Sequence, residues 1–155
     1  MTVSMGYLTP KQLMMWERKR KGLAEATIAR ELNVTRQTVH EALGIAQKKV
    51  LESLEETAAM NKIKVQKVNP RRGYLVGYSP HFKTKALITL SVHKGIQVWY
   101  RDEGDCQTCE HLQTCREALI EEAKERNLLL PENESTMVPS EFAEELFARI
   151  TGEKK

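Results

Sequence analysis

The spacing of apolar residues changes near residue 60 and divides the chain into two parts. Before that point apolar residues recur every three or four positions, which predicts helices. A first helix is expected to begin after Thr9 with Pro10 at its first position, a placement that suits both residue types. A second helix is predicted over residues 24–32 and a third over residues 36–59, because neither range contains a proline.

The predicted third helix carries a long apolar stripe. Its positions are alternately four and three residues apart, so they share one face of a helix. The stripe comprises Val39, Leu43, Ala46, Val50, Ser53 and Thr57, with Leu54 and Ala58 beside its lower end. Such a stripe fits a helix that pairs with a helix of a second chain. It fits a helix that lies on its own domain equally well.

From residue 61 the period becomes two, which predicts strands. Four alternating runs lie within residues 63–100, and Lys94-Gly95 joins the third and fourth as a hairpin. Helices are predicted again over residues 112–127 and from Pro139 or Ser140 onward. The expected fold class is α+β: an N-terminal all-α helix-turn-helix domain over residues 1–60, then a small antiparallel four-stranded α+β domain over residues 61–155.

Composition and charge narrow the class of protein. Of the 155 residues, 41% are apolar and 29% are charged, which allows a packed core, and no apolar run is long enough for a membrane span. The first residues lack a basic segment followed by an apolar one, so we expect a cytoplasmic protein without a secretory leader. Residues 1–100 hold 17 Lys and Arg against seven Asp and Glu, whereas residues 101–155 hold seven against 14. A basic first part favours a polyanionic partner.

Residues 26–43 have the pattern of a helix-turn-helix. Ala29 is small where two helices would cross, Asn33 tolerates the left-handed conformation of a tight turn, and Thr35 can cap the next helix. The helices are expected to pack through Ile28, Leu32, Val34, Val39 and Leu43. In this motif the second helix enters the major groove of double-stranded DNA. The alternatives are a plain three-helix core and a helix-turn-helix that binds protein.

The predicted DNA contacts lie at the start of the third helix. Arg and Gln side chains can make two hydrogen bonds to a guanine or adenine edge, and Thr can meet a phosphate or a thymine methyl group. Lys48 and Lys49 lie further along and are interpreted as phosphate contacts or solvated charges. The candidate DNA-binding residues are therefore Thr35, Arg36, Gln37, Thr38, His40, Glu41, Lys48 and Lys49.

A second basic segment, Pro70-Arg71-Arg72-Gly73, joins the first two predicted strands. We interpret it as a solvated turn rather than a wing that reaches the minor groove. An unbroken helix over residues 36–59 is about 36 Å long at 1.5 Å per residue, and that length carries the first strand away from the DNA.

The first third of the chain resembles a family of regulators. The segment Leu8-Thr9-Pro10-Lys11-Gln12 matches the Leu-Thr-x-x-Gln stretch that opens the family's first helix. Ile28-Ala29-Arg30-Glu31-Leu32 matches its Ile-Ala-x-x-Leu pattern, and Thr35-Arg36 and a long helix to Glu56 follow. Residues 8–58 are thus similar to the helix-turn-helix of the LuxR and sigma-factor region-four type, and most similar to archaeal Tfx-like regulators. The resemblance implies a transcription regulator, usually dimeric.

The cysteines are confined to one short segment that reads C-x2-C-x-H-x3-C. The candidate metal ligands in it are Cys106, Cys109, His111 and Cys115. Four soft donors within ten residues fit a tetrahedral zinc site. The cysteine spacing also resembles three of the four iron–sulfur ligands in oxygen-sensing regulators of the fumarate–nitrate-reduction type and in DNA-glycosylase cluster loops. The fourth ligand would then be His111, His93, His81, an exogenous group or a residue of another subunit, because the chain has no fourth cysteine.

Two other interpretations of the cysteines stay open. They could form a metal-free thiol pair that oxidises reversibly, or they could be buried as small apolar residues. The acidic residues around them are Asp102, Glu103, Asp105 and Glu110. Negative charge of this kind is expected to raise the pKa of a thiol, which favours a bound cation over a reactive thiolate.

These patterns predict a protein that is not an enzyme. The chain has no phosphate loop, dinucleotide-binding glycine pattern, nucleophile elbow or HExxH motif. We expect a homodimeric, sequence-specific DNA-binding transcription regulator whose residues 61–155 bind zinc or an iron–sulfur cluster or sense redox state. The alternative is a metal-stabilised adaptor that binds another protein through its acidic C-terminal helices and senses nothing.

Overall fold

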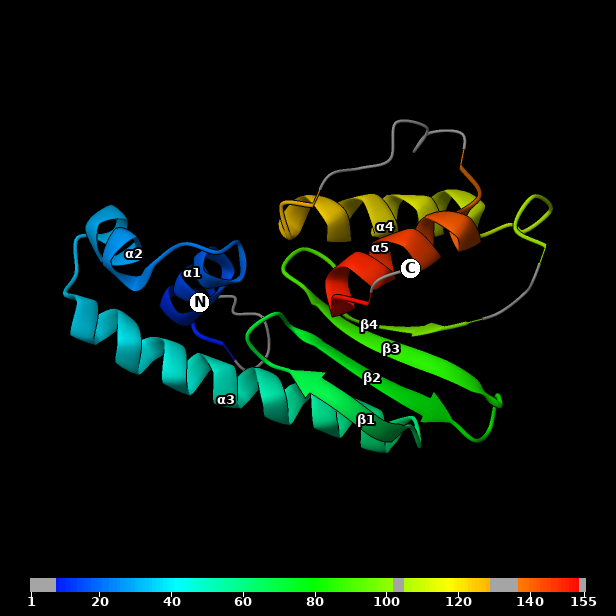
Figure 1. Ribbon diagram of the computed structural model, residues 1–155, viewed down its shortest axis with the longest axis horizontal. Helices are drawn as coiled ribbons and strands as arrows, with labels where there is room; N and C mark the ends of the chain where they lie inside the picture. Colours follow the sequence, from blue (N-terminus) through cyan, green and yellow to red (C-terminus); the bar gives the residue numbers. More distant parts are fainter. Residues whose placement is uncertain (1–7, 102–104, 129–136, 154–155) are drawn as a thin grey trace.

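The computed structural model describes residues 8–101, 105–128 and 137–153. Within those residues the chain forms three helices, a four-stranded antiparallel sheet and two further helices, in that order (Figure 1). The helices are α1 (Pro10–Arg20), α2 (Glu25–Leu32), α3 (Arg36–Met60), α4 (Leu112–Glu125) and α5 (Pro139–Thr151). The strands are β1 (Lys64–Asn69), β2 (Tyr74–Ser79), β3 (Thr84–Ser91) and β4 (Gly95–Tyr100). The predicted α+β class and its order of helices and strands are confirmed.

Local sequence signals set the starts of α1 and α3. The Thr9 hydroxyl accepts a hydrogen bond from the Gln12 backbone N–H at 3.2 Å, and the Gln12 side chain accepts one from the Thr9 N–H at 3.1 Å. This reciprocal pair is a capping box, and it satisfies two amides that have no partner within the helix. Thr35 caps α3 with a single bond of this kind, since its hydroxyl accepts from the Thr38 N–H at 3.1 Å.

The sheet follows chain order, so each strand pairs with its neighbour in sequence. The predicted hairpin between the last two strands is confirmed, with Gly95 at a φ of +76° where its turn closes. A bulge interrupts the pairing of β1 with β2 between Val65 and Lys67. The pairings of β2 with β3 and of β3 with β4 run without interruption.

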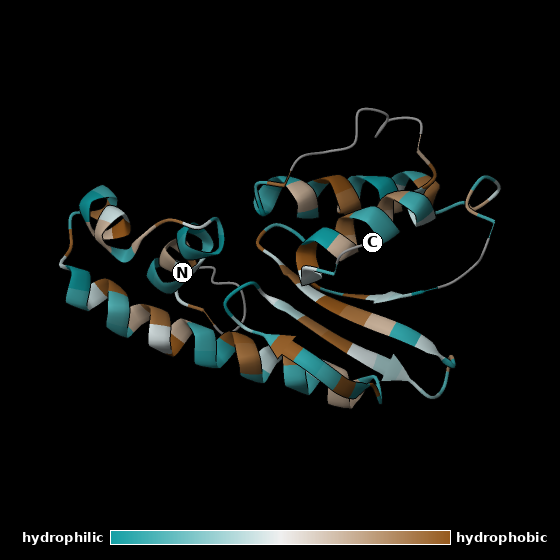
Figure 2. Cartoon of the chain, viewed as in Figure 1, coloured by the Kyte–Doolittle hydropathy of each residue, from teal (hydrophilic) through white to brown (hydrophobic). Residues whose placement is uncertain are grey.

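Helices cover the two faces of the sheet in separate layers. Helices α1 and α3 lie on one face, and α4 and α5 lie on the other. Figure 2 shows apolar residues along β3, between the two layers. On the first face the sheet contributes Leu75, Ala86, Ile88 and Leu90 to the core. On the second face Tyr74 and Leu87 pack with Leu119, Phe142, Leu146 and Ile150.

The apolar stripe of α3 is buried inside its own chain. The helix runs unbroken through Gly44 for 25 residues. Its buried positions are Val39, Leu43, Ala46, Val50, Ser53, Leu54 and Ala58. The first of these pack with α1 and α2, and the later ones pack with the sheet. Of the two interpretations of the stripe, packing within one subunit is the one that the structure bears out.

One core runs across the boundary predicted at residue 60. It contains residues of α1, α2 and α3 together with residues of the strands. Trp16 of α1 is fully buried, and its indole N–H donates to the Pro70 carbonyl at 2.9 Å. A Cβ at Gly73 would lie 2.8 Å from the Trp16 ring, so only glycine fits between that ring and the turn. The helical part and the sheet are therefore packed against each other directly.

A buried ion pair joins α1 to α4. Arg20 donates to Glu125 at 3.2 Å and to the Leu90 carbonyl at 2.7 Å, and the two side chains are 1% and 3% exposed. Burial lowers the pKa of Arg20 to about 10, and Arg126 adds to that shift while Glu125 and Glu122 oppose it. The guanidinium thus remains charged at neutral pH.

The Glu125 carboxylate is the centre of this joint. Besides Arg20, it accepts hydrogen bonds from the Ser91 hydroxyl at 2.8 Å and from the backbone N–H groups of Val92 and His93 at 2.8 and 3.0 Å. Burial by itself raises the pKa of Glu125, but the hydrogen bonds of His93, Val92 and Ser91 and the charge of Arg20 outweigh it, so the pKa lies below its ordinary value.

The first prediction concerns the pH dependence of stability. Because the folded pKa of Glu125 lies below its unfolded value, the ion pair stabilises the fold above the unfolded pKa, and this stabilisation disappears as pH falls through the folded pKa. We expect Glu125→Gln to cost about 3 kcal/mol at neutral pH, since Arg20 loses its counter-charge. Urea unfolding at pH 7 should show this loss, and the gap to the wild type should narrow near pH 3.

Glu121→Gln is the matched control. Glu121 lies one turn earlier on α4, is 30% exposed and approaches His93 only at 3.6 Å. It should change the free energy of unfolding by less than about 0.5 kcal/mol. An equal loss in both variants would contradict the role given to the Arg20–Glu125 pair.

Candidate functional site

The first candidate site is built by α2, the turn after it and α3. Asn33 ends α2 in the left-handed conformation, with φ 53° and ψ 48°, as its residue type predicted. The next N–H, of Val34, donates back to the Ala29 carbonyl at 3.0 Å. Thr35 then starts α3 with its capping bond. A three-residue turn therefore fixes the direction in which α3 leaves α2.

The two helices pack as the sequence predicts. Ile28 and Val39 are fully buried, and Ala29 and Leu43 are 6% and 3% exposed. Leu32 and Val34 are partly buried against the same core. With one side of α3 held in this way, the opposite side of its first turns is left to solvent.

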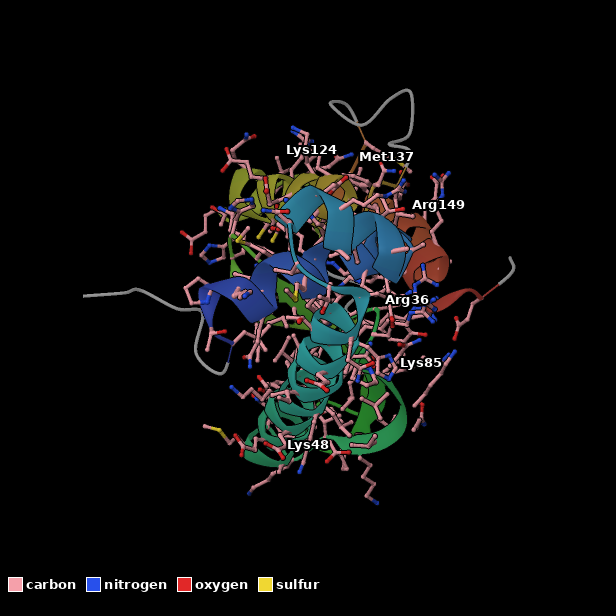
Figure 3. All side chains as sticks on the ribbon, turned by 90° about the vertical axis from the view of Figure 1, so that its left-hand side faces the viewer. Arg36, Lys48, Lys85, Lys124, Met137 and Arg149 are labelled. Atoms are coloured by element: carbon pink, nitrogen blue, oxygen red, sulfur yellow. The ribbon has the colours of Figure 1, made fainter. Side chains whose placement is uncertain are left out.

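That outer side is the reading face, which we define as the exposed α3 positions Arg36, Gln37, His40, Glu41, Gly44 and Lys48. Gln37, Glu41, Gly44 and Lys48 are three or four residues apart, and they point away from the buried stripe. Arg36 and His40 lie along one flank. Figure 3 looks along the molecule from the helical end and shows Arg36 and Lys48 extending from α3. In the described residues no hydrogen bond or ion pair engages either cation.

The other predicted DNA-binding residues already have partners. Gln37 donates to Glu41 at 3.0 Å along the helix, and the His40 Nδ1 lies 3.3 Å from both Glu25 oxygens. The Thr35 and Thr38 hydroxyls lie 2.8 Å apart, so both threonines belong to the helix cap. These bonds hold the side chains near the start of α3 in defined positions before any ligand arrives.

Lys49 lies apart from the reading face. It is half-buried on the side of α3 that faces α1, and its ammonium donates to the Gln12 side chain at 3.1 Å. Beyond Lys48 the outer side of α3 becomes acidic, with exposed Glu52 and Glu55. A polyanion is therefore favoured only along the first half of the helix.

Gly44 is a member of the reading face that sequence reasoning missed. It is exposed, and a Cβ built on it would meet no atom within 4 Å. No contact within the fold therefore requires glycine there, although a glycine inside a helix costs roughly 0.5–1 kcal/mol relative to alanine. The signal was present in the sequence, because Gly44 is the single glycine between residues 36 and 59.

The basic turn at Pro70-Arg71-Arg72-Gly73 lies next to α1. Strand β1 runs back along α3, so the turn returns to Trp16 and is bound to it through the Pro70 carbonyl. The turn is on the packed side of α3, away from the reading face. Arg71 is exposed there, as a solvated turn requires. Helix α3 is unbroken as expected, and β1 begins beyond its far end before it returns the turn to α1.

The three cysteines form the second candidate site. Asp105 holds the turn that contains Cys106, since it accepts from the Gln107 N–H and the Thr108 hydroxyl at 3.0 Å each. Cys109 is exposed, and Cys106 and Cys115 are half-buried. Burial raises the pKa of the Cys115 thiol, and the charges of Cys109 and Cys106 raise it further.

Of the acids named in the sequence, neither Asp105 nor Glu110 is a cause of this shift, and Asp102 and Glu103 lie outside the described residues. Repulsion between neighbouring thiolates favours a bound cation, as the acidic residues were expected to do, because the cation offsets their negative charge. Three sulfur donors are a suitable set for zinc.

The predicted ligand His111 does not join the sulfurs. It is 70% exposed, and its Nε2 lies 3.4 Å from a Glu110 oxygen. In the described part of the chain, the one group of three metal-binding side chains with all ligand atoms within 4.8 Å of each other is His93, Glu121 and Glu125. The three sulfurs are therefore spread more widely than this in the ion-free structure, and they would have to draw together around a metal.

The His93, Glu121 and Glu125 group is better explained without a metal. Glu125 already accepts four hydrogen bonds, one of them from the Arg20 cation. A metal ion there would have to displace a buried arginine from its only carboxylate partner in the described residues. This cluster is part of the joint between α1 and α4.

No family model, curated protein or solved structure matches the chain. Among the described residues, no helix combines the length and the apolar character that crossing a bilayer requires. The two candidate sites are thus interpreted from their own geometry and chemistry.

The second prediction concerns the order in which the thiols react. Cys109 is exposed, whereas Cys115 is half-buried with a raised pKa, so Cys115 holds less of the reactive thiolate. In metal-free protein we expect iodoacetamide to modify Cys109 first and Cys115 last, measured by peptide mass spectrometry at timed intervals. One equivalent of Zn²⁺ should protect all three together. Equal rates in the metal-free protein would contradict the burial argument, and protection of none would contradict a shared metal.

Proposed function

We propose that the protein is a sequence-specific DNA-binding transcription regulator. The start of α3 reads the major groove, the protein acts as a homodimer, and residues 61–155 carry the responsive part. The observation that carries this proposal is the reading face: a capped, rigidly packed helix start whose outer side is exposed and holds Arg36, Gln37, His40 and Lys48. The similarity of residues 8–58 to helix-turn-helix regulators supports the same function.

The chemistry of the reading face suits base recognition. Arg36 can donate two hydrogen bonds to a guanine edge, and Gln37 can pair with an adenine edge once its bond to Glu41 opens. Glu41 can accept from a cytosine amino group. Lys48 lies three turns along the same helix and supplies a phosphate contact. Gly44 lies between these residues, where a missing side chain lets the helix approach the DNA closely.

The cysteine site gives the regulator a place to sense metal or oxidation. Cys106, Cys109 and Cys115 would hold the metal, which would replace the thiol protons and balance the negative charge of the bound sulfurs. A fourth ligand would come from outside this set, since His111 faces Glu110. The adaptor alternative makes a different prediction: removing zinc would lower Tm and leave DNA affinity unchanged.

The third prediction tests DNA binding. A random duplex pool enriched by the wild-type protein should yield a defined sequence, and that duplex is the probe for fluorescence anisotropy. We expect Arg36→Ala to weaken binding by about 1–3 kcal/mol and to relax specificity at one base pair. Lys48→Ala should weaken binding to all sequences and lower the slope of log affinity against log salt by about one.

Lys124→Ala is the matched control for charge. Lys124 is an exposed lysine of α4, on the far side of the molecule from Lys48 (Figure 3), so its loss should leave affinity unchanged. If the pool shows no sequence enrichment, or if Lys124→Ala weakens binding as much as Lys48→Ala, the reading face is not the DNA-binding surface.

The fourth prediction separates stability from function at Gly44. Because the added methyl group meets open space, Gly44→Ala should stabilise the fold by roughly 0.5–1 kcal/mol in urea unfolding. The same variant should bind the selected duplex more weakly, since the methyl group lies between the helix and the DNA. Stabilisation with unchanged affinity would show that the DNA does not approach α3 at this position.

A further inference from the structure

The two edges of the sheet differ in how they are protected against pairing with another strand. An open edge offers unpaired backbone groups, and natural proteins commonly block it with lysines, prolines or bulges. The β1 edge is blocked in this way. Lys64 and Lys67 lie on it, Lys62 precedes it, and a bulge interrupts it after Val65.

Within β4 itself the edge has none of these features, and its nearest lysine, Lys94, lies in the turn before the strand. Its sequence is Gly-Ile-Gln-Val-Trp-Tyr, with no charge and no proline. All six residues pair with β3 in unbroken register, and all six are half-buried. The charge of Arg101, which follows the strand, is paired with Glu144 at 2.8 Å. An uncharged, unbulged and mostly apolar edge of six residues is suited to accept another strand.

The direction of the β4 amides follows from the pairing. The Arg101 N–H donates to the Lys85 carbonyl across the ladder at 3.1 Å. Residues of an antiparallel strand alternate between bonding to one neighbour and facing the other. The N–H and C=O groups of Trp99 and Gln97 therefore face β3, and those of Ile96, Val98 and Tyr100 face the open edge.

An apolar surface continues beside this edge. Ile96, Val98 and Tyr100 are partly buried against the core on the α3 side of the sheet. Phe82, in the turn between β2 and β3, is 57% exposed and packs on the Tyr100 ring with centroids 4.6 Å apart. The open amides and the exposed aromatic ring thus lie together along one side of the molecule.

We propose that two copies of this chain associate through their β4 strands, which pair antiparallel across a two-fold axis at Val98. The outward-facing residues are self-complementary: Val98 meets Val98 of the second copy, and Ile96 meets its Tyr100, so six hydrogen bonds and three apolar cross-strand pairs form. Such an isologous contact closes after two copies. The α3 stripe does not compete for this role, because it is buried inside its own chain.

This pairing rests on the proposed function, because its role is to supply the dimer that places two reading faces on one DNA. It joins the two four-stranded sheets into one sheet of eight strands. The contact itself forms without DNA, so it is tested on the free protein.

The test measures mass and amide exchange of the full chain without DNA. Sedimentation should give twice the chain mass. Hydrogen exchange followed by NMR should show the Ile96, Val98 and Tyr100 amides protected as strongly as those of Gln97 and Trp99. A monomer at NMR concentrations overturns the proposal. A dimer in which the three outward amides exchange at least tenfold faster than their neighbours overturns it too.

Two valine variants complete the test. Val98→Lys places two ammonium groups against each other at the axis and should halve the mass, whereas Val65→Lys, on the β1 edge, should leave it unchanged. Loss of the dimer in both variants overturns the assignment to β4. The exchange pattern of the wild type decides the question even if Val98→Lys fails to fold. A DNA-binding failure with the dimer intact would count against the reading face alone.

Discussion

The pairing of Arg20 with Glu125 is the constraint on which the arrangement of the molecule depends. It joins residues 105 positions apart, at the end of α1 and the end of α4, and both are almost fully removed from water. Burying two charges costs several kcal/mol per ion unless other bonds replace the lost hydration. Here three donors complete the shell of Glu125, and the Arg20 guanidinium lies 4.6 Å from the Trp16 ring. The pair thus holds the end of α1 against the end of α4 and the turn between β3 and β4.

A second buried ion pair lies on the second face of the sheet. Glu122 is fully buried, bound to the Thr89 hydroxyl at 2.6 Å and to Arg126 at 3.0 Å. Arg126 also donates to the backbone carbonyls of Arg72 and Gly73, in the turn that rests on Trp16. Arg20 lies over the Trp16 ring, and Arg126 binds the turn that rests on that ring, so both ion pairs border the contact between α1 and the sheet.

The parts of this fold that sequence could predict are those with local causes. Thr9, Asn33 and Thr35 act through bonds to their own neighbours, so their roles in capping and turning were visible in residue type and spacing. The apolar stripe of α3 could also be predicted, but the elements that pack on it could not. Periodicity shows which side of a helix is apolar and does not show what lies against it. The cysteines show the same division. Their spacing predicted a group, whereas the departure of His111 toward Glu110 depends on the conformation before α4.

Long-range pairs were beyond the reach of the pattern. Arg20 is the residue of the basic run that shares a helix face with Leu13 and Trp16, so its inward position has a local cause. Its partner has none, because the place of Glu125 depends on the whole sheet. Whether residue 60 separates two domains also depends on long-range packing, which the sequence pattern does not give. The hydrophobic period changes there, yet the residues on either side share one core.

This shared core limits how the proposed regulator can respond. Helix α3 runs about 37 Å from the reading face into the core of the second part, at 1.5 Å for each of its 25 residues. A reading helix that is continuous with the core cannot swing on a linker. A signal can then act by breaking the Arg20–Glu125 joint, which costs several kcal/mol, or by moving whole subunits relative to each other. In the proposed dimer the second route needs only a small rotation at the β4 edge, because α3 carries that rotation to both reading faces.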